Sequence, residues 1–195
     1  SFAESLEFPN GDWTQKAPSE VNISEEKVNT LFDLSFADSA TQAVVLIKDG
    51  YLIGERYAEE FDASSFGTSW SMAKSFYAAL IGISIDRDEI RSLDDKVGLY
   101  LEFFNDERSE VTIRDLLDMT SGLEYPENEH ENMFFLYDQL EYAQQIGMEK
   151  EPRTLFEYNN VNSMLLGDIL QKATGQRADE LLVERIFSKI GVNDF

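Results

Sequence analysis

The chain has 195 residues, enough for one well-formed hydrophobic core, and its 43% hydrophobic and 12% aromatic residues are typical of a globular protein. Its 16 basic and 38 acidic residues give a formal net charge of -22. Nucleic acids and anionic membrane surfaces are therefore excluded as favourable partners, because they carry charge of the same sign. The acidity is typical of a highly soluble surface, and an acidic patch that recruits a cationic substrate is the alternative interpretation.

The sequence contains no cysteine, which excludes disulfides, thiolate nucleophiles and zinc–sulfur sites. The longest apolar run, Phe76 to Ile85, is much shorter than the roughly 20 residues of a membrane span, so no membrane insertion is expected. The chain starts at Ser1 in place of Met, which is compatible with a signal peptide already removed. A periplasmic or secreted location is favoured over a cytoplasmic one.

The single histidine, His130, lies in the acidic stretch 127–132, which is typical of an exposed loop. A Ser-His-Asp triad or a histidine metal site would have to use this one residue. We therefore expect a solvated loop histidine, no metal and no organic cofactor. Hydrolytic chemistry in this chain would need another base.

The first twenty residues are rich in turn-forming types and predict an irregular leader. A helix should follow, because Ser24 is a suitable N-cap and Val28, Leu31 and Phe32 recur at helical spacing. Two β-rich runs, 43–48 and 51–57, then flank Asp49-Gly50. Both of these turn residues tolerate positive φ, so the pattern predicts a β-hairpin.

A second helix is predicted from Ser71 to Asp86, and its uncharged middle indicates burial on all sides. The rest of the chain is mostly helical. Further helices are expected at Ile113 to Met119 (capped by Thr112), Met133 to Ile146, Asn162 to Ala173 and Ala178 to Ile190.

These elements predict a mixed α/β (α+β) fold in one domain. Residues 1–60 supply the leader, a helix and the hairpin of an antiparallel sheet, and residues 61–195 form a helical region carrying the active site. An isolated hairpin is only marginally stable in water. We therefore expect C-terminal strands absent from this chain to complete the sheet, so that the domain is incomplete at its C-terminus.

The chemistry is expected at Ser71 and Lys74, which share one face of a helix that starts at Ser71. The Ser71 hydroxyl would lie at the positive end of the helix dipole, and Lys74 could accept its proton. The spacing alone is weakly specific, since Ser24 and Lys27 match it too. There, two glutamates on a charged helix start favour a structural role.

A second group of interest is Tyr158 and Asn160, which can place a phenol and an amide in one pocket. A phenolate at Tyr158, stabilised by the Lys74 ammonium, could carry a proton to a leaving group. The alternative is an aromatic loop anchor followed by a helix with an asparagine cap.

Taken together, these residues resemble the class C-type branch of the β-lactamase and penicillin-recognising superfamily. That branch includes class C β-lactamases, D-amino-acid peptidases, esterases and 6-aminohexanoate-dimer hydrolases, and the last group with its related esterases looks closest. The likeness covers about 43–192 and rests on Ser71-Met72-Ala73-Lys74-Ser75-Phe76, Tyr158-Asn159-Asn160, Ser92-Leu93-Asp94-Asp95-Lys96-Val97, the run 111–123, Leu165-Leu166-Gly167-Asp168-Ile169-Leu170 and Ala173-Thr174-Gly175.

The resemblance implies a β-lactamase-like fold, with Ser71 as acylated nucleophile, Lys74 as its base, Tyr158 as second proton carrier and Asn160 as a substrate-binding residue. It also implies an oxyanion hole made by the backbone N–H of Ser71 and one from a later strand. Two departures stand out. No residues after Tyr158 match the family's third motif, and Arg153 stands where relatives commonly carry glycine, which changes the loop or places a cation near the pocket.

The sequence thus predicts a serine hydrolase that cleaves an amide or ester bond in a small molecule through an acyl-enzyme. A β-lactamase or D,D-peptidase is the alternative within the enzymes. The alternatives outside them are a binding scaffold that has lost its chemistry, and a fragment that is inactive without a further C-terminal segment.

Overall fold

The structure is a computed structural model, and it describes residues 8–9, 11–126 and 132–193. The chain divides into two compact units, one of residues 1–68 and 187–195 and the other of residues 69–186. His130 lies outside the described residues, so the prediction of a solvated loop histidine stays a prediction.

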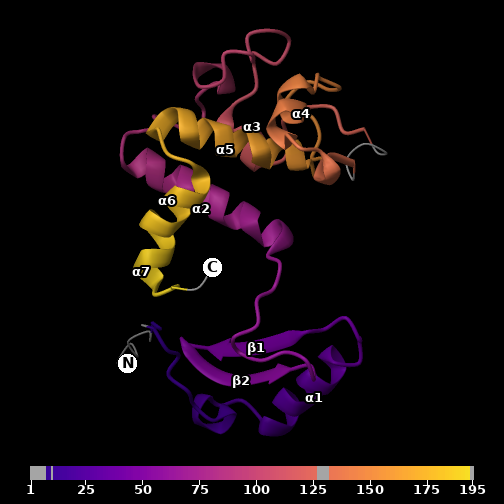
Figure 1. Cartoon of the computed structure of the whole chain (residues 1–195), viewed down its shortest axis with the longest axis vertical. Helices are drawn as coiled ribbons and strands as arrows, with labels where there is room; N and C mark the ends of the chain where they lie inside the picture. Colours follow the sequence, from indigo (N-terminus) through magenta and orange to yellow (C-terminus); the bar gives the residue numbers. More distant parts are fainter. Residues whose placement is uncertain (1–7, 10, 127–131, 194–195) are drawn as a thin grey trace. The chain divides into compact units, whose positions relative to one another are not determined.

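The first unit contains a short 3₁₀ turn, η1 (Pro18–Val21), then α1 (Glu25–Ser35) and the antiparallel hairpin β1 (Ala43–Lys48) and β2 (Tyr51–Tyr57) (Figure 1). The Ser24 hydroxyl caps α1 by accepting the Lys27 N–H, as predicted. Asp49 and Gly50 join the strands with φ values of 53° and 84°. The two strands and their turn were therefore predicted correctly from the Asp-Gly signal.

Burial of α1 against the hairpin holds the first unit together. Val28 and Phe32 of α1 are buried, and a Cβ at Gly54 of β2 would approach the Phe32 ring to 3.0 Å. The predicted irregular leader is partly ordered, because Gln15 pairs in parallel with Leu52 of β2. Backbone pairing of this kind leaves no hydrophobic period in the sequence, so the pattern could not indicate it.

The second unit is helical, and α5 runs through its middle in contact with α2, α3 and α4 (Figure 1). Its elements are η2 (Trp70–Met72), α2 (Ala73–Asp86), η3 (Val97–Leu99), α3 (Ile113–Leu117), η4 (Asn132–Phe135), α4 (Gln139–Gln145), α5 (Asn160–Thr174), α6 (Ala178–Leu182) and the π-helical turn η5 (Val183–Phe187), at which the unit ends. The short helix α7 (Ser188–Ile190) that follows belongs to the first unit. Fully buried core side chains include Ile81, Phe104, Ile113, Leu116, Leu165 and Ile169.

Two predicted helices are interrupted. The helix expected over Met133 to Ile146 is a 3₁₀ turn followed by α4, because the Asp138 side chain accepts the Glu141 N–H and so starts a new helix. The helix expected over Ala178 to Ile190 is broken by the π turn η5. By contrast, Thr112 caps α3 as predicted, and Asp115 completes a capping box with it.

The prediction that α2 is buried on all sides is wrong for one face. Leu80, Ile81 and Ser84 are buried on the side that packs against α5 and α6. Ala79 and Gly82 are exposed. Their side chains are small, so this face leaves little apolar area in water.

The predicted mixed fold of helices and an antiparallel sheet is confirmed. Among the residues that the structure describes, β1 and β2 are the only strands of the sheet. Within the same ranges, every helix is too short or too polar to span a lipid bilayer.

Candidate active site

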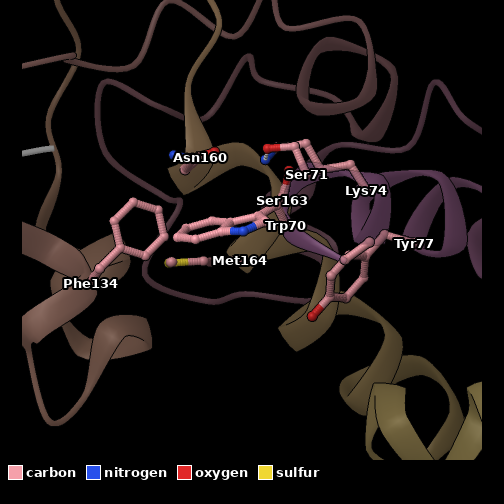
Figure 2. Close-up of a pocket in the computed structure, with 9 residues that line it drawn as sticks. Trp70, Ser71, Lys74, Tyr77, Phe134, Asn160, Ser163 and Met164 are labelled. Carbon is pink, nitrogen blue, oxygen red and sulfur yellow. Dashed lines mark hydrogen bonds between the residues drawn. The ribbon is translucent and has the colours of Figure 1, made fainter. Parts of the chain in front are cut away.

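Ser71 and Lys74 lie at the start of the α2 segment, at one end of the second unit. Ser71 belongs to η2, and Lys74 follows one turn later in α2. The Lys74 Nζ donates a hydrogen bond to Ser71 Oγ over 2.9 Å (Figure 2). The predicted pair therefore forms in the structure, with the hydroxyl at the positive end of a helical segment.

Tyr158 reaches the same hydroxyl from the loop that precedes α5. Its OH donates to Ser71 Oγ over 2.6 Å, and the Lys74 Nζ lies 4.9 Å from the centre of its ring. The pKa of Tyr158 is lowered, first by its side-chain hydrogen bond with Lys74 and then by that with Ser71. Ser71 Oγ thus receives two hydrogen bonds from groups that can move protons.

Tyr158 and the two asparagines that follow it, Asn159 and Asn160, have different surroundings in the structure. Asn159 is 2% exposed, and its Oδ1 accepts the Val161 N–H over 3.0 Å, so Asn159 is the asparagine cap of α5. Its Nδ2 donates to the Glu124 carbonyl over 3.0 Å. Asn160, one residue further, lines the cavity beside Ser71.

A cavity of about 170 Å³ opens next to Ser71 and Lys74 (Figure 2). One wall is a face of α5, where Asn160, Ser163 and Met164 follow at spacings of three and four residues. The remaining lining residues are Trp70, Ala73, Tyr77 and Phe134.

Six of the lining residues were not predicted from the sequence as part of the site: Trp70, Ala73, Tyr77, Phe134, Ser163 and Met164. Helical spacing from Asn160 could have indicated Ser163 and Met164. Phe134 comes from η4, which lies far from Ser71 in the sequence, so only the folded chain reveals it.

Close packing of α2 on α5 fixes the two walls of the cavity against each other. Gly167 of α5 faces the ring of Tyr77 on α2, and a Cβ there would lie 3.2 Å from that ring. A side chain at this position would therefore require the Tyr77 ring to move by a few tenths of an ångström.

Next to Ser71, Trp70 has a φ of 44°, which bulky residues seldom adopt. Such strained backbone often occurs at functional sites.

No group of three or more His, Cys, Asp or Glu residues in the described ranges is placed to hold a metal ion. The groups bonded to the Ser71 hydroxyl are the Lys74 amine and the Tyr158 phenol, and the Asn160 amide lies in the adjoining cavity. This set of groups is suited to acyl transfer.

The fold and the arrangement of these residues are those of a β-lactamase-type domain. The Beta-lactamase family profile matches residues 37–195. The chain belongs to this family, whose members include hydrolases of amides and esters.

Individual relatives agree with this assignment. A D-aminopeptidase from Brucella anthropi is 33% identical in an alignment of length 138 that covers 63% of this chain and 24% of the relative. Among solved structures, a protein described as a 6-aminohexanoate-dimer hydrolase from Bacillus anthracis has a TM-score of 0.77 at 22% identity, with 95% of this chain and 55% of that one covered. A D-stereospecific amidohydrolase from Streptomyces has a TM-score of 0.69 at 20% identity, with 85% and 54% covered.

At these identities the structural matches show the fold alone, and the predicted β-lactamase-like fold is confirmed. The chain spans about half the length of the matched structures and about a quarter of the matched D-aminopeptidase.

Proposed function

We propose that this chain carries the nucleophile of a serine hydrolase that cleaves an amide or ester bond through an acyl-enzyme on Ser71. The observation that carries the proposal is the pair of hydrogen bonds on Ser71 Oγ, from Lys74 Nζ at 2.9 Å and from Tyr158 OH at 2.6 Å. A hydroxyl between an amine and a phenol can lose its proton to one of them, which makes it a nucleophile.

In the proposed reaction Lys74, as the neutral amine, takes the proton of Ser71 while Oγ bonds to the substrate carbonyl carbon. The carbonyl oxygen becomes an oxyanion, which the backbone N–H of Ser71 would stabilise by about 3 kcal/mol. The oxyanion collapses and breaks the bond to the leaving group, and Tyr158 donates its proton to that group. Lys74 then returns its proton to Tyr158. Water then attacks the carbonyl carbon of the acyl-enzyme and gives up a proton to the same groups. The bond from that carbon to Ser71 Oγ breaks, Oγ regains a proton, and the acid is released.

The cavity beside Ser71 favours an uncharged, apolar acyl group. Trp70, Phe134 and Met164 give it an apolar wall. No Asp or Glu of the described residues lines it, although the chain has 38 acidic residues, and its only cation is Lys74. A charged acyl group would lose water there without gaining a fixed partner.

A series of esters with one leaving group tests this proposal. We expect kcat/KM for p-nitrophenyl pentanoate to exceed that for the 4-aminobutanoate and succinate esters by at least about tenfold, because only the pentanoate has an uncharged acyl chain. A chromogenic cephalosporin, which carries a carboxylate, should be hydrolysed more slowly than the pentanoate ester. The rates are measured on the natural full-length protein.

The variant Ser71→Ala is the reference for every substrate, and its rate is subtracted. Faster turnover of a charged ester or of the cephalosporin would overturn the proposed acyl preference. Equal rates in the parent protein and in Ser71→Ala would overturn the proposed reaction and favour a binding scaffold.

A further inference from the structure

The segment that leads to Tyr158 is held mainly by its backbone. The N–H groups of Glu149 and Lys150 both donate to the Gly122 carbonyl, and the Glu157 N–H donates to the Met119 carbonyl over 2.9 Å. Leu155, Phe156 and Tyr158 are themselves exposed. Burial of its own side chain therefore does not fix the place of Tyr158. Its position depends on these ties to the turn after α3 and on its buried neighbour Asn159.

Arg153 makes a further tie in the middle of this segment. Its backbone N–H donates to the Thr120 carbonyl over 2.8 Å, and its φ is 67°, in the left-handed region that favours glycine. Arginine here accepts backbone strain that glycine would avoid, and its side chain makes an interaction that glycine could not make.

That interaction is an ion pair with Asp115. One guanidinium nitrogen of Arg153 lies 2.8 Å from Asp115 Oδ2, and the Asp115 side chain is 1% exposed. The same oxygen accepts hydrogen bonds from the N–H and the hydroxyl of Thr112, at the cap of α3. Arg153 is therefore not among the residues that line the cavity, and its charge is directed to the buried carboxylate.

We propose that Arg153 is a positioning residue, which joins the Tyr158 segment to the cap of α3 through Asp115 and so holds the phenol at Ser71. This inference rests on the proposed function. The path is continuous, because Asp115 and Met119 belong to α3 and the turn after it, and Glu157 directly precedes Tyr158. Without the pair, the segment from Arg153 to Tyr158 keeps its backbone hydrogen bonds and an ion pair between Lys150 and Glu157. It also keeps the bond from the Thr154 hydroxyl to the Glu151 carbonyl and the bond from Tyr158 to Ser71.

The variant Arg153→Gly separates this role from a role in folding, because glycine relieves the φ strain and removes only the ion pair. We expect a cooperative melting transition close to that of the parent protein and a kcat lowered by about 10- to 100-fold, the size of effect that small misplacements of a reacting group produce. KM should change little, since Arg153 does not line the cavity. The alkaline limb of the kcat/KM profile should move to higher pH, because a displaced Tyr158 loses contact with Lys74.

Two further variants test the route through Asp115. Asp115→Asn keeps an acceptor for Thr112 but removes the charge, so it should lower kcat as Arg153→Gly does, and the double variant should be no worse than either. Arg153→Lys should restore part of the lost kcat. Arg114→Gln, which breaks the exposed pair of Arg114 with Asp94, is the matched control and should leave kcat unchanged.

The outcomes separate this inference from the proposed function. The natural full-length protein and Ser71→Ala are assayed first with p-nitrophenyl pentanoate, and turnover that does not depend on Ser71 overturns both proposals. If turnover depends on Ser71 but Arg153→Gly has the parent kcat and pH profile, only the positioning role is overturned. An equal further loss when Arg153→Gly is added to Asp115→Asn would also overturn it.

Discussion

Replacing Lys74 by methionine should lower kcat by about 10³-fold, within the range for loss of a general base. Methionine keeps the length and the apolar part of the side chain, so the variant removes the amine that donates to Ser71 Oγ over 2.9 Å and leaves the packing largely intact. Removal of this cation should also raise the pKa of Tyr158 toward about 10, because its hydrogen bond with Lys74 is the main cause of the lowered pKa.

The two effects are measured separately, by single-turnover kinetics with a neutral ester and by ultraviolet titration of phenolate. Subtraction of a Tyr158→Phe titration isolates Tyr158 from the other tyrosines. Lys27→Met is a matched control, because Lys27 belongs to the second Ser-x-x-Lys match and its backbone N–H, which the substitution keeps, donates to the Ser24 hydroxyl. A parent-like kcat in Lys74→Met would show that Lys74 is not the base.

The variant Tyr158→Phe should lower kcat by about 10²-fold, because it removes a proton carrier while keeping the aromatic ring. Its pH profile is the more specific result. In the parent protein kcat/KM should fall at alkaline pH as Tyr158 loses the proton that it donates to the leaving group, and the lowered pKa of Tyr158 places this fall below about pH 10. Without the phenol this falling limb should disappear.

Profiles of kcat/KM against pH for the two proteins test this expectation. Tyr137→Phe is the control, because the Tyr137 side chain is fully exposed and its phenol should have no part in the reaction. An unchanged limb in Tyr158→Phe would assign the ionisation to another group and remove Tyr158 from the proton route.

Local signals explain why much of the fold could be predicted. The Asp49-Gly50 turn, the Ser24 and Thr112 caps and the apolar period of α1 each act over a few residues, so the sequence shows them directly. The break before α4 and the π turn were missed, because Asp138 competes with the helical pattern around it and a π turn has no periodic signature.

The residues of the site also differ in whether local sequence signals predict their contacts. Ser71 and Lys74 meet because they lie one helical turn apart, which the spacing already predicts. Tyr158 lies 87 residues from Ser71, and only the family resemblance placed it there. The ion pair of Arg153 with Asp115 depends on a left-handed φ and on a buried carboxylate from another element. Neither feature can be read from the sequence, so the sequence alone did not show whether the Arg153 side chain points toward the pocket.

The central claim is an activated serine at position 71, and labelling with a fluorophosphonate probe followed by intact mass measurement tests it most directly. The natural full-length protein should gain one adduct. The adduct should be absent from Ser71→Ala and present in Ser24→Ala, where the other Ser-x-x-Lys match is altered. A protein that gains no adduct, or an adduct that persists in Ser71→Ala, would contradict the account.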